Sequence, residues 1–159
     1  MDGISVLSAK DVNSKKLGKI YATIDDNRYL LLFTKNIKAD LEKKKDEVTI
    51  LGQLQTGHKA SGLKYTGTMT IYDCTPLFKK QFLQFQDEGV DVYFDMQISS
   101  EDPTSDNGAE EIILTGVNLD KLTLTSLDAD GTWKESDCDF TFEKFQMPET
   151  YSELDGVSQ

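Results

Sequence analysis

The chain has few of the side chains on which catalysis and metal binding usually depend. Its 159 residues include one histidine and two cysteines. A catalytic nucleophile needs a nearby base, and His58 lies in a stretch with three glycines, residues 52–62, that predicts an exposed, flexible loop. Cys74 and Cys138 are too far from His58 and from each other in sequence to give the ligand spacing of a zinc site. We therefore predict that the protein is not an enzyme and holds no metal or cofactor.

Surplus basic charge and long apolar runs are also missing. Lys and Arg number 17 against 28 Asp and Glu, which gives a net charge of −11. A DNA or RNA binder needs surplus basic residues to displace counterions from phosphates, and an anionic lipid surface attracts the same residues. No apolar stretch approaches the roughly 18 residues of a membrane span, and the N-terminus does not resemble a signal peptide. These features predict a protein that is made in a cytoplasm, is soluble there and has no membrane anchor.

The charges present are unevenly distributed between the two halves. Residues 1–80 contain 14 basic and 9 acidic side chains, a balance of +5, whereas residues 81–159 contain 3 basic and 19 acidic ones, a balance of −16. A basic surface on one copy could therefore bind an acidic surface on the next copy in a head-to-tail contact. A solvated acidic surface is the alternative interpretation.

Alternation of apolar and polar residues predicts a chain that is mostly strand. Residues 35–47 are mostly charged and favour an exposed extended strand, with a short charged helix as the alternative. The other predicted strands, about seven in total, cover residues 20–24, 29–34, 65–72, 91–98, 112–116, 119–127 and 139–143, and a short apolar run covers 48–51. Because strands follow one another closely, we expect a mainly antiparallel sheet.

One helix is predicted over residues 76–88. Thr75 is a suitable N-cap, Gly89 a suitable C-cap, and three phenylalanines at 78, 82 and 85 form one apolar face that we expect to pack on the sheet. The predicted fold class is mainly β (α+β), an antiparallel β-sandwich or open barrel with one flanking helix. We expect an N-terminal arm at 1–16, one domain at 17–147 with a hairpin or loop extension at about 35–64, and a C-terminal tail at 148–159.

Several segments in the right order carry a resemblance to a known family. They are KKKDEV at 43–48, LG at 51–52, TGHK at 56–59, GTMTIY at 67–72, DVYF at 91–94, EDPTS at 101–105, VNLD at 117–120 and FTFEKF at 140–145. Together they resemble the tail tube proteins of contractile-tailed phages and of phage-tail-like bacteriocins, above all the PBSX-like prophage type. The chain differs from that pattern in a longer, more apolar N-terminal stretch and in the loop around Trp133.

The resemblance implies a ring-forming structural protein with the tail-tube fold. Six copies would form a ring whose strands join one inner barrel, and rings would stack into a hollow tube inside a sheath. The tube would penetrate the target envelope and conduct DNA or ions. The implied partners are other copies of the chain, a tail sheath protein, a baseplate or tube initiator, and passing DNA that is not bound specifically. The implied locations are the bacterial cytoplasm during assembly and then a virion tail or an extracellular bacteriocin particle.

The resemblance also directs attention to two sets of residues. The basic segment and the glycine loop would form a projecting element that reaches an adjacent subunit or ring, a mobile surface loop being the alternative. The candidate inter-subunit residues are Lys43, Lys44, Lys45, Glu47, Val48, Leu51, Gly52, Gly57, His58 and Lys59. The candidate lumen residues lie on one of two polar strand faces, Thr66, Thr68 and Thr70 or Asp95 and Gln97.

Two other functions remain open at this point. One is a monomeric β-barrel that binds a small ligand or an unrelated protein. The other is an inner tube protein of a type VI secretion system, which would share a similar fold.

Overall fold

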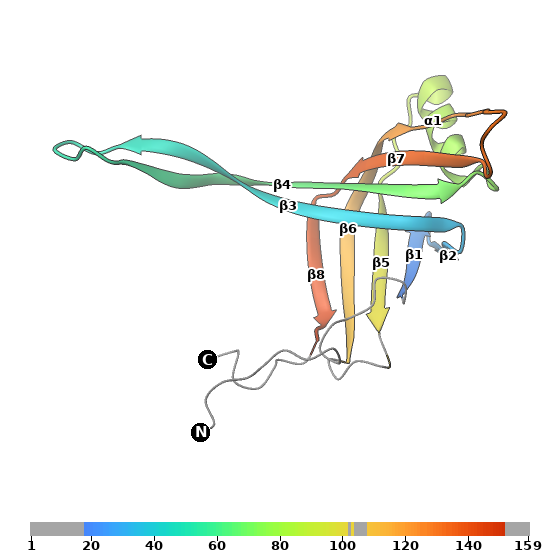
Figure 1. Ribbon diagram of the computed structural model, residues 1–159, viewed down its shortest axis with the longest axis horizontal. Helices are drawn as coiled ribbons and strands as arrows, with labels where there is room; N and C mark the ends of the chain where they lie inside the picture. The colour runs from blue at the N-terminus through green and yellow to red at the C-terminus, as the bar shows by residue number, and fades with distance from the viewer. Residues whose placement is uncertain (1–17, 102, 104–107, 152–159) are drawn as a thin grey trace.

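The computed structural model describes residues 18–101, 103 and 108–151, and the predicted N-terminal arm and residues 152–159 of the predicted tail lie outside this part. The described residues form eight strands and one helix (Figure 1). The elements are β1 (Gly18–Ile24), β2 (Asn27–Leu30), β3 (Thr34–Thr49), β4 (Thr56–Tyr72), α1 (Leu77–Glu88), β5 (Phe94–Glu101), β6 (Ala109–Leu122), β7 (Glu135–Thr141) and β8 (Lys144–Glu149). No helix in this part is long and apolar enough to cross a membrane.

The strands pair antiparallel in the order β2-β1-β5-β6-β7-β4-β3, and β8 also pairs with β6. Strand β6 belongs to two layers, because residues 109–117 pair with β5 whereas residues 118–122 pair with β7. We call β1, β2, β5, β8 and residues 109–117 of β6 the short-strand layer. We call β3, β4, β7 and residues 118–122 of β6 the hairpin layer. Figure 1 shows the strands of the two layers running across one another, so the chain forms an open sandwich.

The change of layer in β6 occurs at Gly116, which has a φ of 71°. This backbone conformation is favourable only for glycine. A Cβ at this position would also lie 2.8 Å from the carboxylate of Glu143, so a larger residue would require the Glu143 side chain to move. The carboxylate of Asp95 accepts a hydrogen bond from the Gly116 N–H at 3.3 Å, which holds the bend against β5.

The core lies between the two layers and under α1. The hairpin layer contributes Met69 and Phe140, and the short-strand layer contributes Met96, all nearly completely buried. From α1, Phe78 inserts its ring 6.0 Å from that of Phe94, measured between centroids. The core therefore explains the alternating patterns of these strands, since the buried residues are every second residue along them.

The predicted helix is confirmed with small differences at its start. Pro76, not Thr75, is the N-cap, although the Thr75 hydroxyl still accepts a hydrogen bond from the Leu77 N–H at 3.4 Å. Gly89 ends the helix in the left-handed conformation with a φ of 69°, as predicted. The predicted apolar face is only partly covered, because Phe78 is buried whereas the side chain of Phe85 is 53% exposed.

Three of the predicted segments were wrong in kind or number, and the strands predicted at 29–34 and 91–98 lie at 27–30 and 94–101 instead. The flexible loop at 52–62 is mostly strand, because β3 supplies a pairing partner from Thr56 onward and glycine tolerates extended backbone. The two strands at 112–116 and 119–127 are one strand that ends at Leu122, because Gly116 bends β6 without ending it. The last strand at 139–143 is two strands, β7 and β8. Pro148 lies within β8, where an edge position tolerates the missing N–H.

Candidate assembly surfaces

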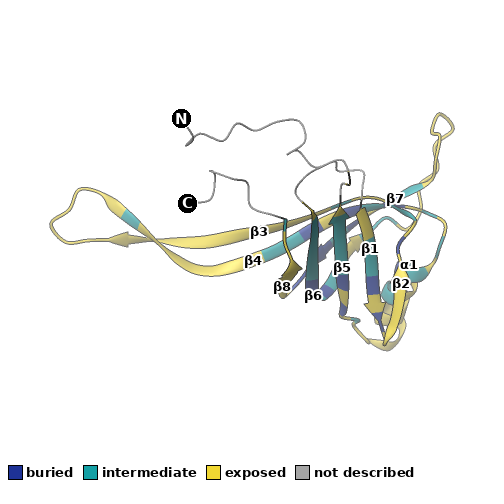
Figure 2. Ribbon diagram, turned by 90° about the horizontal axis from the view of Figure 1, so that it is seen from below, coloured by how far each residue is buried: buried dark blue, intermediate teal, exposed yellow. Residues whose placement is uncertain are grey.

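Strands β3 and β4 form one long hairpin that leaves the body of the molecule. They pair from Thr34 and Ile71 at the base to Thr49 and Thr56 near the tip. Every residue from 38 to 56 is exposed, and Figures 1 and 2 show this half projecting away from all other elements. A two-stranded ribbon without a third strand has no core of its own. Its sequence must therefore be explained by something other than packing within the chain.

The end of the hairpin, residues 50–55, combines a tight turn with exposed leucines. Gly52 has a φ of 83°, and the Gln53 N–H donates to the Ile50 carbonyl at 3.2 Å. The side chains of Leu51 and Leu54 are fully exposed. Residues 43–59 contain four basic and two acidic side chains. We call residues 50–55 the hairpin tip. It carries exposed leucines, and the strands that lead to it form the stem of the hairpin.

All ten predicted inter-subunit residues lie in the outer part of this hairpin. Within it, Glu47 lies opposite His58 and Val48 lies opposite Gly57. Their positions are Lys43, Lys44, Lys45, Glu47 and Val48 on β3, Leu51 and Gly52 in the tip, and Gly57, His58 and Lys59 on β4. The structure brings these residues together, and their contact with another copy stays a prediction. Sequence reasoning missed Leu54, although an isolated leucine among polar turn residues was a usable signal.

The apolar face of the hairpin continues beyond the core without cover. At the base, Ile37 pairs with Met69 over the core. Farther out, Leu41 pairs with Tyr65, and the next apolar residue, Leu63, is half-exposed like Leu41. Tyr65 itself is half-buried, with its ring centre 5.2 Å from that of Phe142, so the uncovered residues are Leu41 and Leu63, which we call the hairpin stripe. Contiguous exposed apolar residues of this kind mark interaction sites.

The predicted lumen residues of β4 form a polar face on the hairpin layer. Thr68 lies opposite Asp139, and Thr70 lies opposite Asp137. The Thr70 hydroxyl donates a hydrogen bond to the Asp137 carboxylate at 3.0 Å. These residues border a shallow cavity of about 350 Å³. We call Thr66, Thr68 and Thr70 the threonine face.

The second predicted lumen set, Asp95 and Gln97, lies on the other layer. Gln97 accepts a hydrogen bond from Arg28 at 2.9 Å and donates one to Glu111, so a polar network crosses the short-strand layer. The guanidinium of Arg28 also lies 4.0 Å from the centre of the Tyr21 ring. Both sets face away from the core, which lies between the layers. The structure therefore separates the two predicted sets onto opposite sides of the molecule.

A buried ion cluster secures the segment that leads into α1. The Asp73 carboxylate, 8% exposed, accepts from Lys79 at 2.8 Å and lies 3.2 Å from the ammonium of Lys134. The hydrogen bond from Lys79 lowers the pKa of Asp73 against the effect of burial. The cluster joins the start of α1 to the segment before β7, which is a structural role.

The part of the chain that the structure describes contains two free cysteines. Burial raises the pKa of the Cys138 thiol to about 12, so this cysteine stays protonated. Cys74 is exposed and free. Among residues 18–101, 103 and 108–151, no three His, Cys, Asp or Glu side chains are grouped so that they could hold a metal ion.

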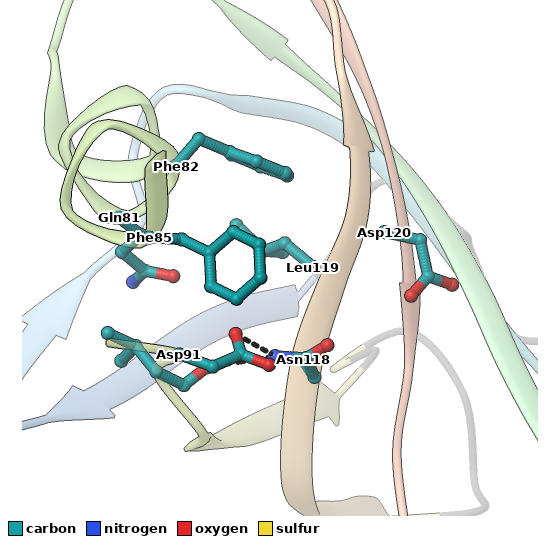
Figure 3. A pocket seen from close by; sticks show the side chains of 8 residues that line it. Gln81, Phe82, Phe85, Asp91, Asn118, Leu119 and Asp120 are labelled. Carbon is teal, nitrogen blue, oxygen red and sulfur yellow. Dashed lines mark hydrogen bonds between the residues drawn. The ribbon is translucent and has the colours of Figure 1, made fainter. Parts of the chain in front are cut away.

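A half-open groove of about 310 Å³ lies between α1 and β6 (Figure 3). Phe82 and Phe85 extend from α1 toward Leu119 of β6, and Asp91 lies below them. Asn118 donates hydrogen bonds to the Asp91 carboxylate at 2.7 Å and to a backbone carbonyl at 3.2 Å. We call this cavity the α1 groove; it is lined by Gln81, Phe82, Phe85, Asp91, Val92, Asn118, Leu119 and Asp120.

Comparison of the sequence with known proteins gives two kinds of match. Residues 5–149 match the family described as phage tail tube protein. The chain is 35% identical over 147 residues to phage-like element PBSX protein XkdM of Bacillus subtilis (strain 168), covering 92% of this chain and 97% of that protein. It is also 35% identical over 143 residues to the uncharacterized protein YqbM of the same strain, covering 90% and 95% of the two chains.

Solved structures with low sequence identity share the fold. A chain of the anti-feeding prophage tube-terminating cap has a TM-score of 0.65 at 13% identity, covering 94% of this chain and 96% of that one. A chain of the SPP1 tail tube has a TM-score of 0.63 at 8% identity, with 92% and 83% covered. A chain of the PVC sheath–tube complex has a TM-score of 0.60 at 13% identity, with 81% and 87% covered. The predicted mainly antiparallel fold with one helix is therefore confirmed.

Proposed function

Because the chain belongs to the phage tail tube protein family, we propose that its copies form hexameric rings that stack into the hollow inner tube of a contractile tail. The structural role in a tail tube is the premise, and the ring, its stacking and its partners are the proposal. The observation that carries it is the long hairpin, whose outer half has exposed leucines and packs against no other element of the described residues. The role requires no catalytic group.

The hairpin layer has two edges that a ring could join. Within the described residues, β3 pairs only with β4, and residues 118–122 of β6 pair only with β7. The four strands alternate in direction, so an adjacent copy related by rotation would place its β3 antiparallel to β6. An even number of strands in each copy maintains that alternation around the whole ring. When the hairpin layers of adjacent copies join in this way, both exposed edges of each hairpin layer gain a partner.

Residues 123–127 support this junction. Thr123 still donates its N–H to the Asp137 carbonyl of β7 at 2.9 Å, but residues 124–127 lie beyond this contact, and the side chains of Leu124 and Leu127 are largely exposed. Residues 124–127 continue the alternating pattern of β6 beyond its pairing within the described residues, which is consistent with pairing in the assembly. We propose that β3 of the next copy supplies the partner and lengthens β6 by these residues.

Closure through the hairpin layer decides which polar face lines the tube. The core and the short-strand layer lie on one side of the hairpin layer, so its threonine face would point into the ring. Asp137 and Asp139 would add carboxylates beside Thr68 and Thr70. Lys38 and Lys121 lie on the same face, opposite Thr68 and Asp139, so the wall would carry charges of both signs. At physiological salt the Debye length is about 8 Å, so the carboxylates would repel DNA phosphates only close to the wall. Asp95 and Gln97 would then face outward.

The proposed partners and location follow from the tail role. Chains of similar fold come from a sheath–tube complex and from a baseplate, which supports a tail sheath protein and a baseplate initiator as partners of this chain. We propose that the chain is made in a bacterial cytoplasm and ends in a virion tail or a phage-tail-like bacteriocin particle. The tube would conduct DNA in the first case and ions in the second.

Negative-stain electron microscopy of the purified chain tests the proposal directly. We expect rings or tubes with sixfold symmetry at high protein concentration or after addition of baseplate nucleators. A chain that stays monomeric at every concentration, with and without nucleators, would refute the proposed assembly. Sedimentation of the same samples measures how much protein has polymerised.

A further inference from the structure

A large open cavity of about 950 Å³ lies beside the free edge of β3 and is lined by both layers. In Figure 1 the lower ends of β5, β6 and β8 extend below β3, so the short-strand layer overhangs this edge of the hairpin layer. We call the space the β3-edge cavity. It is lined by residues 18–20 of β1, 34–38 of β3, 98–100 of β5 and Thr68 of β4.

Three isoleucines of this cavity are only partly covered. Ile20 and Ile98 pair with each other in the short-strand layer, and Ile37 belongs to β3. All three pack against the core, yet each is only half-buried. The apolar interior of the sandwich is therefore open at this edge of the described chain, which marks an interaction site.

The backbone beside the cavity also offers a free strand edge. Within the described residues, β3 pairs only with β4. A strand from another copy could pair with β3 and at the same time direct every second side chain into the cavity. The β6 extension that we propose as the partner of β3 is such a strand.

Leu124 lies on the side of this extension that would face the cavity. Leu122 pairs with Cys138, which is buried in the core, whereas Thr123 borders the cavity beside the threonine face. Because side chains alternate along a strand, Leu124 points to the same side as Leu122, toward the short-strand layer. In its own chain the side chain of Leu124 is 64% exposed.

The pairings within one copy place the end of β6 and the start of β3 at the same level of the hairpin layer. The Thr123 N–H donates to the Asp137 carbonyl at 2.9 Å. Asp137 lies opposite Thr70, and Thr70 lies opposite Asn36. Residue 123 and residue 36 therefore stand on one line across the four strands.

This level determines where Leu124 meets an adjacent copy. If the hairpin layers join without a shift in register, Leu124 lies beside residues 34–35 of the next copy. A shift of two residues toward the hairpin tip, of the kind that tilted strands in a closed barrel produce, brings it beside Ile37. Both positions border the β3-edge cavity.

Charge contributes little to this fit. Lys35 already pairs with Glu135 at 2.9 Å, and the ammonium of Lys38 lies 3.8 Å from the Asp40 carboxylate. These partners belong to the same chain. The contact therefore depends on apolar side chains and backbone pairing.

We propose that Leu124 of one copy inserts its side chain into the β3-edge cavity of the adjacent copy, where it packs against Ile20, Ile37 and Ile98. This inference rests on the proposed function as a self-assembling tube subunit. It adds the contact that determines which face of the β6 extension turns inward, because a slip of one residue would place Thr125 in the apolar cavity instead.

Cysteine cross-linking in assembled tubes tests the contact. One Cys74→Ser chain carries Leu124→Cys, and a second, of different length, carries Thr34→Cys or Ile37→Cys so that both registers are covered. The two chains are mixed, assembled and oxidised. Buried Cys138, with its raised pKa, stays unreactive. We expect a mixed dimer from one of these two pairs.

Thr125→Cys replaces Leu124→Cys in the matched control. Thr125 is exposed and lies one residue away, but its side chain points to the other side of the strand. It should therefore give much less mixed dimer with the same partner chains.

The outcomes separate this inference from the proposed function. Tubes that form without a mixed dimer from Leu124→Cys, or with an equal yield from Thr125→Cys, would overturn the cavity contact and leave the tube function standing. Absence of rings and tubes for the unmodified chain would overturn both.

A second set of variants does not depend on cross-linking. Leu124→Asp should raise the critical concentration of polymerisation about tenfold or more, because burying a leucine at a contact contributes at least that much affinity. Thr125→Asp places the same charge on the other face of the segment and should raise it less. Leu124 is exposed in the single chain, so the urea midpoint of unfolding should not change. Equal critical concentrations for the unmodified chain and the Leu124→Asp variant would overturn the proposal.

Discussion

Reversing the charge of residues 43–45 is the sharpest test of the basic hairpin. The three lysines are exposed and lie opposite uncharged residues of β4. No ion pair within the described part of the chain involves them. Their replacement by glutamate should therefore change the free energy of unfolding of the monomer by less than about 0.5 kcal/mol.

The same change should affect assembly strongly. The net charge of residues 43–59 changes from +2 to −4 when the three lysines become glutamates. Each exposed attraction contributes about 0.2–1 kcal/mol, and reversal replaces it with repulsion of similar size. Summed over three lysines, the contact should lose about 1–6 kcal/mol per copy, which equals a rise of about fivefold or more in the critical concentration.

Sedimentation over a concentration series, with electron microscopy of the pellets, measures this rise. Replacement of the same lysines by arginine is the matched control and should preserve assembly, whereas glutamine should give an intermediate effect. Added salt should reduce the difference in critical concentration between the unmodified chain and the glutamate variant, because it screens exposed charges. An unchanged critical concentration for a folded glutamate variant at low salt would refute docking through these lysines.

Three further predictions concern the ring junction and the monomer. Because the Thr123 N–H points to β7, the N–H of Ser126 would point to the opposite, free edge of the extended β6. Ser126→Pro removes this donor and should block tube formation seen by microscopy, whereas Ser126→Ala should not; tubes formed by the proline variant would contradict the junction. Gly67→Ala should lower the free energy of unfolding in urea by about 1–3 kcal/mol, because its Cβ would overlap the Phe140 ring, whereas Gly62→Ala has open space and should be neutral. The lowered pKa of Asp73 means that its charged form stabilises the fold above the usual value of 3.8 and that this contribution is lost as the pH falls through the lower folded value. Thermal unfolding should therefore show Asp73→Asn destabilised at pH 7 and the difference shrinking below pH 4; a constant difference would contradict this role.

Local signals predicted the helix well. The glycine at 89 and the phenylalanine spacing depend on residues within four positions of one another, and the structure ends α1 at that glycine. The exposed, charged strand at 35–47 was also predicted from its spacing, and the structure places it in β3. The helix depends on contacts that are short in sequence, whereas the strand was predicted from its own spacing although its partner β4 lies farther along the chain.

Strand boundaries failed where the decisive partner is distant in sequence. The pairing of β4 with β3 turned a glycine-containing loop into strand, and only the three-dimensional arrangement shows that β6 changes layers at Gly116. The candidate assembly surfaces were also hard to predict where they depend on residues that are distant in sequence. The sequence placed Lys43 and His58 in one element, but it did not show that Leu54 shares their tip or that Phe85 stays exposed.

The hairpin links the folding of each copy to its assembly. The half from residue 38 to 56 has no third strand and no core, and a two-stranded ribbon of this kind is only marginally stable in water. Its lysines and the irregular pairing between Lys44 and Lys45 are the features that hinder unspecific pairing of an exposed strand edge. We infer that the same lysines keep free copies apart until a surface of opposite charge is presented in the correct geometry. On this reasoning, replacing them with uncharged residues should weaken ordered tubes and increase irregular aggregates together, and light scattering with microscopy can measure both. A variant that loses tubes without any rise in aggregates would show that the lysines act in docking alone.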